Sequence, residues 1–430
     1  MSSIATPSGD ATTPTSAKAV IAATIGNMLE WYDILIYAAF AAPISKAFFP
    51  TDNPTLSLLV GWIVFAIGFT ARPLGAVLLG AYADRRGRRA ALSLTIFLMA
   101  LGTAMIAFCP AHASIGVAAP VVIVLARIIQ GFSAGGEIGG AVSTLVENAP
   151  AERRGFYASF QQMSQGGANI LSGLVPLLIA FSLSEADVTS WGWRVAFAVG
   201  LLIAPVGVYI RRSLDEAALF KQAQSQPEAR TPIKVVLVDH WRGVLAGVLI
   251  VMLWTVAQYT TSFMPTFASR ELKMSLTNSY FAPFVTGLVL LLSPVIGILS
   301  DRFRRKWVMA LGALAALALA YPTFANLVAQ PTLPTLILTQ VVVGLCLLIY
   351  SAPASAVLAE LFPTHVRATG VSLAYSLGVA IFGGFAPTII TALIGSTGRP
   401  VSIAFYLMGA ALVSLLAVLL LRDRTGERLI

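Results

Sequence analysis

The apolar runs of this chain constrain its fold more than any other feature. They are about 20 residues long, the length that a helix needs to cross a hydrocarbon core of roughly 30 Å at about 1.5 Å per residue. Lipid offers no hydrogen-bond partners, so these runs are expected to be helices, and the alternating strands of an outer-membrane barrel are absent. Charged residues make up only 11% of the chain, against about 25% in soluble domains, which excludes a soluble globular protein.

Twelve such segments are present, and the polar stretch 212–241 separates them into six and six. We therefore predict an all-α membrane protein with twelve transmembrane helices in two pseudo-symmetric six-helix bundles. A disordered cytoplasmic tail is expected at 1–17, the bundles at 18–212 and 242–430, and a cytoplasmic inter-bundle loop at 213–241. The predicted spans are 19–47, 56–82, 90–109, 117–146, 155–182, 191–211, 242–268, 278–300, 307–328, 333–359, 368–395 and 400–421.

The basic residues predict the orientation. If the N-terminus is cytoplasmic, 21 of the 28 Lys and Arg residues fall in inner segments, and only Arg72 and Arg127 lie inside spans. Cytoplasmic loops carry such an excess, so we expect a multi-pass protein of the cell inner membrane with both termini in the cytoplasm. This placement also accounts for the net charge of +9, so no nucleic-acid partner is expected.

The sequence offers little for a signal peptide, a metal or a cofactor. Residues 1–17 have no basic region before an apolar core, which argues against a cleavable signal peptide. Cys109 and Cys346 are too few for a disulfide framework or a zinc site, and we interpret them as packing residues. No histidine falls in a predicted span. We therefore predict that the chain is not an enzyme and uses neither a metal nor a cofactor.

The two halves repeat each other. The segment from Gly80 to Arg89, with Asp84 inside it, follows the second span, and the segment from Gly297 to Lys306, with Asp301 inside it, follows the eighth. Two Glu/Arg pairs, each separated by seven residues, recur at a similar offset: Glu147 with Arg154, and Glu360 with Arg367. Such an internal duplication is typical of transporters built from two six-helix bundles.

These motifs resemble those of the major facilitator superfamily. The loop with Asp84, Gly87 and Arg88 is similar to its signature between spans two and three, and the segment from Arg127 to Gly131 is similar to its fourth-span signature. We expect Asp84 to pair with Arg153 or Arg154 near Glu147 and to latch the bundles together on the cytoplasmic side. The predicted cytoplasmic gate comprises Asp84, Arg88, Glu147, Arg154, Asp301, Glu360 and Arg367.

A narrower resemblance covers nearly the whole chain. Gly26 to Asp33 resembles the first-span motif of the metabolite–proton symporter branch, and Gly131 to Gly140 its fourth span. The segments from Gly68 to Gly75, Arg211 to Glu216 and Ser372 to Gly384 are similar to those of citrate and tricarballylate–proton symporters. The Glu30-Trp-Tyr-Asp33 form of the first motif is that of the wider branch, which includes carriers of proline and betaine.

Five charged residues lie inside predicted spans: Glu30, Asp33, Arg72, Arg127 and Glu137. Burying an ionisable group in a bilayer is costly, so each is a functional candidate. Three acids against two arginines leave one acid in excess, which suits a proton carrier. We predict that Asp33 carries the proton, with Glu137 and Glu30 as alternatives. The alternative is that one or two of these acids serve only as counter-ions of Arg72 and Arg127 and carry no proton.

The arginines are the predicted substrate ligands. Guanidinium forks hold carboxylates well, so Arg127 is expected to bind substrate first and Arg72 second, unless they only neutralise the acids. Gln161, Gln165 and Asn169 form one stripe on the fifth span, and a polar stripe in lipid must face protein or water. The other expected contacts are Asn27, Tyr32, Gln130, Tyr350 and Tyr375.

The sequence therefore predicts a secondary active transporter in the lipid bilayer, a symporter of protons and a small di- or tricarboxylate that works by alternating access. Citrate or tricarballylate is the first choice of organic acid. The alternatives are a zwitterionic osmolyte such as proline or betaine, or another acid such as shikimate or 2-oxoglutarate. We expect a monomer.

Overall fold

The computed structural model describes residues 17–86, 88–135, 137–147, 149–202, 232–427 and 429. Within these residues the regular structure is helical and no strand occurs, which confirms the all-α prediction. Residues 1–16 of the predicted tail at 1–17 and most of the predicted loop at 213–241 lie outside this part of the chain. So do the side chains of Asp84, Arg88 and Glu137, although these residues lie on described helices.

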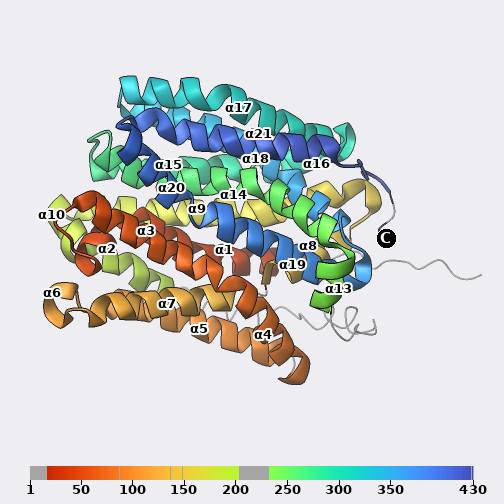
Figure 1. The fold of residues 1–430 in the computed structure, drawn as a ribbon, viewed down its shortest axis with the longest axis horizontal. Helices are drawn as coiled ribbons and strands as arrows, with labels where there is room; N and C mark the ends of the chain where they lie inside the picture. The colour runs from red at the N-terminus through yellow and green to blue at the C-terminus, as the bar shows by residue number, and fades with distance from the viewer. Residues whose placement is uncertain are drawn as a thin grey trace, which may run out of the picture.

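In Figure 1 the helices between residues 17 and 147 lie mostly in the lower part and those between residues 241 and 360 in the upper part. The N-terminal helices are α1 (Ala17–Ala39), α2 (Ala41–Phe48), α3 (Pro54–Thr70), α4 (Arg72–Arg86), α5 (Arg88–Phe108), α6 (His112–Ile115), α7 (Ala118–Ala134), α8 (Glu137–Glu147), α9 (Arg154–Ser182) and α10 (Glu185–Asp187). Residues 193–202 are also helical and belong to the sixth predicted span.

The C-terminal half begins with α13 (Pro232–Asp239), a short helix in the segment predicted as loop. The helices that follow are α14 (Trp241–Arg270), α15 (Leu276–Leu290), α16 (Ser293–Phe303), α17 (Arg305–Ala329), α18 (Leu333–Glu360), α19 (Arg367–Gly378), α20 (Ala386–Thr397) and α21 (Ile403–Leu420). Five residues between α19 and α20, Val379–Gly383, form a π-helix.

Local capping chemistry sets the start of two of the long helices, α3 and α18. The Asn53 side chain accepts hydrogen bonds from the main-chain N–H groups of Thr55 and Leu56, directly before Pro54. Such a cap satisfies donors that the first helical turn leaves free, and proline fits the first helical position. Thr332 caps α18 in the same way and exchanges hydrogen bonds with Thr335. These two caps fix the residues at which α3 and α18 begin.

Eight helical stretches of the described chain are long and apolar enough to cross a membrane, or nine if the bent pair α15 and α16 counts as one span. That pair bends by 44°. The second and fourth predicted spans are interrupted only locally, between α3 and α4 and between α7 and α8, and each continues as one span, Pro54–Leu79 and Ala118–Glu147. The predicted spans thus fall on helices in the described chain.

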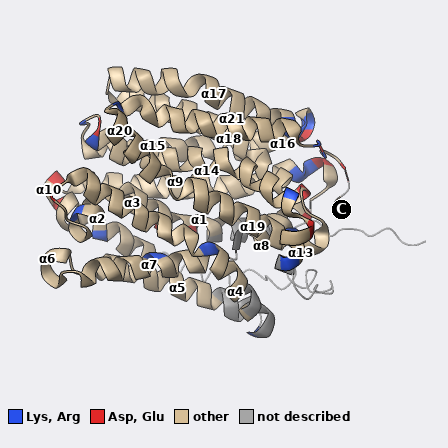
Figure 2. Cartoon of the chain, viewed as in Figure 1, with Lys and Arg blue, Asp and Glu red and all other residues tan. Residues whose placement is uncertain are grey.

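The surface along the helices is apolar. Large apolar residues are strongly exposed there, such as Leu74 at 63%, Phe97 at 61%, Phe181 at 65% and Leu420 at 88%. Figure 2 shows that charged residues gather at the two ends of the bundle and leave its length almost uncharged. This distribution matches the hydrocarbon core of a bilayer between two aqueous sides.

Helix α9 forms much of the seam between the halves, because it packs against α15, α16 and α18 as well as α1. Glycines allow the close approach. A Cβ added at Gly287 of α15 would lie 2.7 Å from the carbonyl oxygen of Gly166 on α9, and one at Gly173 would lie 2.4 Å from the nitrogen of Phe284. Small residues at such crossings are typical of helices packed in membranes.

Candidate functional site

Two arginines lie in the middle of the N-terminal half, each between two aromatic rings. The Arg127 guanidinium of α7 lies 4.7 Å from the Tyr37 ring and 4.9 Å from the Phe65 ring. The Arg72 guanidinium lies 4.7 Å from the Phe69 ring and 5.3 Å from the Trp31 ring. In each case α1 supplies one ring and α3 the other. Aromatic faces attract a cation and partly replace its lost hydration.

Glycine contacts place Arg127 against α3. A Cβ added at Gly131 would lie 1.6 Å from the carbonyl oxygen of Gly68, so α7 and α3 touch main chain to main chain. At this separation the Arg127 side chain reaches across α3, and its Nη2 donates a hydrogen bond to the carbonyl oxygen of Phe65 at 3.3 Å.

A chain of hydrogen bonds connects Arg127 to Asp33. Arg127 Nη1 donates to Gln130 Oε1 at 2.8 Å, Gln130 Nε2 donates to Thr103 Oγ1 at 3.0 Å, and the Thr103 hydroxyl donates to Asp33 Oδ2 at 2.8 Å. All four side chains are buried. Asp33 and Arg127 are therefore connected through the neutral side chains of Thr103 and Gln130 and not by a direct contact.

Among the described side chains, no carboxylate forms an ion pair with Arg72 or Arg127. Several of their buried donors have no hydrogen-bond acceptor among the described residues, namely Arg72 Nε and Nη1 and Arg127 Nε. Asp33 Oδ1 is also buried and meets no described donor, and a Cβ added at Gly200 would lie 2.5 Å from it. Since an unsatisfied buried polar atom is costly, these atoms mark a place built for a polar ligand or water.

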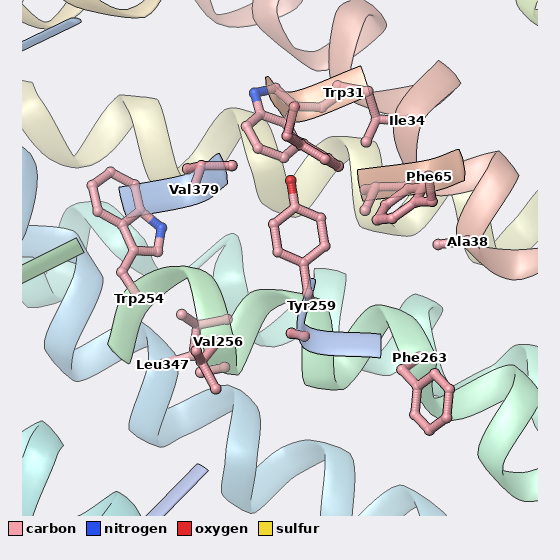
Figure 3. Close-up of a cluster of buried hydrophobic side chains, with 14 of the residues drawn as sticks. Trp31, Ile34, Ala38, Phe65, Trp254, Val256, Tyr259, Phe263, Leu347 and Val379 are labelled. Atoms are coloured by element: carbon pink, nitrogen blue, oxygen red, sulfur yellow. The ribbon is translucent and has the colours of Figure 1, made fainter. Parts of the chain in front are cut away.

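Tyr259 of α14 brings the C-terminal half to the two arginines. Its ring packs edge-on against Phe65 at 5.8 Å and Phe69 at 5.2 Å. Figure 3 shows its hydroxyl pointing toward Trp31, and no described group bonds to that hydroxyl. Trp62 and Phe263, 5.5 Å apart, continue this aromatic contact between the halves.

The polar stripe of α9 faces α1 and α14. Asn27 of α1 donates a short hydrogen bond to Ser164 and accepts one from Gln161 at 3.3 Å. Asn169 accepts a hydrogen bond from Gln258 of α14 at 3.4 Å, which joins the two halves. Gln165, between them, is buried and lies within reach of Tyr375 of α19. The stripe is therefore internal, as the sequence pattern indicated.

Two predicted contact residues bond within their own half. The Tyr32 hydroxyl donates to the carbonyl oxygen of Ala196 at 2.8 Å, inside the N-terminal half. The Tyr350 hydroxyl donates to the carbonyl oxygen of Ile250 at 2.9 Å, inside the C-terminal half. Tyr375 is buried with its ring 5.2 Å from that of Trp254, and it lies near Arg72 and Gln165 at the centre. Glu30 is partly exposed, and the Glu137 side chain lies outside the described structure.

At one end of the molecule, near α13 and α16 in Figure 2, charged residues of both halves meet in an ionic cluster. Glu147 of α8 accepts a hydrogen bond from Arg367 Nη1 of α19 at 2.7 Å. Glu360 of α18 lies 3.8 Å from Arg154 of α9. Each glutamate thus faces the arginine of the other half. The cluster comprises Glu147, Arg154, Asp301, Arg305, Glu360 and Arg367.

Asp301 fastens α16 to the first turn of α9. Its Oδ1 accepts a hydrogen bond from the Gly155 N–H at 2.8 Å and its Oδ2 one from the Phe156 N–H at 2.9 Å. A carboxylate at a helix N-terminus is stabilised by free N–H groups and by the helix dipole. Arg305 bonds to the same Asp301 at 2.7 Å and to Glu360.

The predicted latch of Asp84 with Arg153 or Arg154 stays a prediction. Arg154 turns to Glu360 and also donates to the carbonyl oxygen of Glu427 at 2.7 Å, while the Asp84 side chain lies outside the described structure. The sequence analysis missed Arg305 and Thr103. Arg305 stands 217 residues after Arg88, the same offset as between the aspartates, and this could have identified it. A threonine in an apolar run carries no comparable signal.

Family comparisons agree with this architecture. A sequence model described as sugar (and other) transporter matches residues 18–239, and one described as major facilitator superfamily matches residues 287–429. Solved structures with the same fold include a D-xylose–proton symporter, with a TM-score of 0.73, 18% identity, and coverage of 96% of this chain and 99% of that one.

Curated relatives match over nearly the whole length. A citrate–proton symporter of Salmonella typhi is 37% identical, covering 95% of this chain and 94% of its own, and one of Klebsiella pneumoniae is 38% identical, covering 96% and 93%. A proline/betaine transporter of Salmonella typhimurium is 30% identical, covering 96% of this chain and 84% of its own.

Proposed function

Because the chain belongs to the major facilitator superfamily of membrane transporters, we propose that it carries a small di- or tricarboxylate, citrate first, across the inner membrane together with protons. The relatives named as citrate–proton symporters support this choice of substrate. The chain works as a monomer by alternating access, with both termini in the cytoplasm.

The observation that carries the proposal is the pair of buried arginines without a carboxylate partner among the described side chains. Arg127 and Arg72 lie near enough to interact electrostatically, and both face Tyr259. A substrate with two or more carboxylates offers both guanidinium groups an acceptor and offsets their mutual repulsion. Gln165 and the Tyr259 hydroxyl supply further hydrogen bonds.

Asp33 is the proposed proton carrier. It is the buried acid connected to Arg127, and its free Oδ1 is a site at which a proton can bind. A charged carboxylate at this depth is costly, and protonation removes the charge. Proton and substrate then favour the same conformation, as symport requires. Glu137 and Glu30 are the alternative carriers.

The ionic cluster is the proposed cytoplasmic gate, to which Asp84 and Arg88 also belong. Three of its contacts join the two halves: Glu147 with Arg367, Glu360 with Arg154, and Asp301 with the first turn of α9. Opening this end must break these contacts. Each charged partner regains water on opening, which keeps the net cost of the step small. The cluster is closed in this structure, and the aromatic contacts from Tyr259 and Phe263 close the middle.

Uptake of labelled citrate into proteoliposomes under an inward proton gradient tests the proposal. We expect accumulation by the wild type and its loss in Asp33→Asn and Arg127→Ala. Asp239→Asn, which changes an exposed acid on α13, is the matched control and should transport normally. Accumulation of proline or betaine in place of citrate would refute the substrate assignment.

A zwitterionic osmolyte is the second candidate. The proline/betaine relatives support it, and the rings of Trp31, Phe69 and Tyr259 lie together near the arginines; aromatic faces are the groups that attract quaternary ammonium ligands. These rings already pack around the arginines, so such a ligand would have to share them with Arg72. This competition places the carboxylate first.

A further inference from the structure

The hydrogen-bond chain from Arg127 to Asp33 has a single direction. Arg127 donates to Gln130, Gln130 donates to Thr103, and Thr103 donates to Asp33. Every donor therefore points from the cation toward the anion. Aligned hydrogen bonds polarise one another in a low-dielectric interior, so the chain connects the two charges more strongly than three isolated bonds would.

The Thr103 hydroxyl has a second acceptor in reach. It lies 2.8 Å from Asp33 Oδ2 and 3.0 Å from the carbonyl oxygen of Met99, one turn back on α5. A hydroxyl has one proton and can satisfy only one of these acceptors fully. An ionised Asp33 holds the hydroxyl, because a charged acceptor makes the stronger bond. A protonated Asp33 is the weaker acceptor and leaves the hydroxyl to Met99.

Two members of the chain are closely packed on one side. A Cβ added at Gly102 would lie 2.6 Å from Gln130 Cγ, and one at Gly200 would lie 2.5 Å from Asp33 Oδ1. Glycine at these two positions therefore lets the main chain approach Gln130 and Asp33 closely. The charged or titratable groups that face Asp33 among the described side chains are Arg127 and the neighbouring Tyr32. Thr103 of α5 and Gly200 do not titrate.

We propose that Thr103 and Gln130 are positioning residues that transmit the protonation state of Asp33 to Arg127 and so couple proton binding to carboxylate binding. With Asp33 ionised, the chain stabilises Arg127 internally. When a proton binds to Asp33, Thr103 turns to Met99, the charge that held Arg127 is gone, and its guanidinium becomes available to the substrate. No other bond forms or breaks. The inference rests on the proposed function, because it assigns roles within the same transport cycle.

The test removes the hydroxyl and restores it. Thr103→Val keeps the shape of the side chain without the hydroxyl, and Thr103→Ser restores the hydroxyl. Each variant of the full chain is reconstituted in proteoliposomes, and the KM for citrate in citrate–citrate counterflow is measured at acidic and alkaline pH. Coupling between two ligands typically changes affinity by roughly 5- to 150-fold, so we expect a wild-type pH response of KM in this range.

We expect Thr103→Val to flatten this pH response and to abolish proton-driven accumulation, with a smaller effect on the maximal rate of counterflow. Thr103→Ser should recover both. A structural defect would lower the maximal rate and leave the pH response of KM in place. Gln130→Met interrupts the same hydrogen-bond chain at Gln130. If Thr103→Val does not fold, the pH response of KM in Gln130→Met decides whether the chain couples Asp33 to Arg127.

Thr286→Val is the matched control. Thr286 of α15 is equally buried, lies 3.2 Å from the carbonyl oxygen of Ala282 one turn back, and donates to Gln340 at 2.8 Å, but it contacts no charged group. Its removal should leave the pH response of KM intact. A wild-type pH response in Thr103→Val would overturn the relay alone, whereas a wild type that accumulates no citrate would overturn the proposed function on which the relay rests.

Discussion

Replacement of Asp301 by asparagine should open the ionic end of the molecule. The Asp301 carboxylate accepts two main-chain hydrogen bonds from Gly155 and Phe156 across the seam between the halves, at 2.8 and 2.9 Å. An asparagine at this position retains one acceptor and turns an N–H donor toward the second main-chain N–H. Because the contacts cross the seam, their loss destabilises the closed conformation and leaves the open one unchanged.

The magnitude follows from the bonds lost. A hydrogen bond to a charged group contributes about 1.5–3 kcal/mol, and a carboxylate at a helix N-terminus contributes about 0.3–1 kcal/mol more. We therefore expect a loss of about 2–4 kcal/mol, which shifts the equilibrium between closed and open by roughly 30- to 1,000-fold. Such a change converts a closed population into a largely open one.

Pulsed electron resonance measures this shift directly. Spin labels at Glu152 and Arg302, both exposed and on opposite sides of the seam, report the separation of the halves in a background without Cys109 and Cys346. The Asp301→Asn variant should gain a population at longer distance. An unchanged distance distribution, or an equal change in the Asp239→Asn control, would refute the reasoning.

Three further predictions concern helix contacts, the arginine fork and the C-terminal segment. Gly131→Ala should lower the thermal stability in detergent, by about 1–3 kcal/mol of overpacking, because its Cβ would lie 1.6 Å from a main-chain oxygen of α3, whereas Gly409→Ala meets nothing within 4 Å and should not. Arg127→Lys keeps the positive charge but loses the paired N–H donors of the guanidinium group. The KM for citrate in counterflow should therefore rise roughly 10- to 150-fold, the equivalent of one charged hydrogen bond. An unchanged KM would exclude a direct contact between Arg127 and citrate. Deletion of 423–430 removes the Glu427 carbonyl that accepts from Arg154 across the seam at 2.7 Å, and also the contacts of Arg424 to Glu360 and of Thr425 to Arg305, which lie within the C-terminal half. The lost contact across the seam should shift the equilibrium toward the open conformation roughly 10- to 150-fold, since a hydrogen bond to a charged group contributes about 1.5–3 kcal/mol; the same spin-label distances measure it.

The fold was largely predictable because the cost of exposing a polar main chain to lipid leaves few alternatives. A run of about 20 apolar residues must be a helix, and the predicted spans lie on helices throughout the described chain. The breaks inside the spans were less predictable. The bend of 44° between α15 and α16 lies at Leu291 and Leu292, before Pro294, and a proline in an apolar run does not by itself distinguish a bend from a straight helix.

The charges at the ionic end show where sequence reasoning stops. The duplication revealed two Glu/Arg pairs but not which arginine each glutamate faces. Pairing within one half and pairing across the halves satisfy the same sequence. The structure pairs Glu147 with Arg367 and places Glu360 near Arg154, and only this exchange lets the charges respond to separation of the halves. The pairing of each glutamate with an arginine of the other half is therefore set by the tertiary fold and cannot be predicted from the spacing of these residues in the sequence.

Helix α9 connects the two parts of the proposed mechanism. Its first turn is held by Asp301 at the ionic end, and two turns further on Gln161 and Gln165 begin the polar stripe at the centre. The helix runs from Arg154 to Ser182, and its internal proline, Pro176, lies beyond the stripe. A movement that separates the first turn from Asp301 must therefore carry the stripe with it as one rigid segment. Because Asn169 also bonds to Gln258 across the seam, the same movement breaks the contact at the gate and the contact at the centre. A substrate held between the stripe and the arginines would favour the conformation in which Asp301 contacts α9 and Asn169 contacts Gln258.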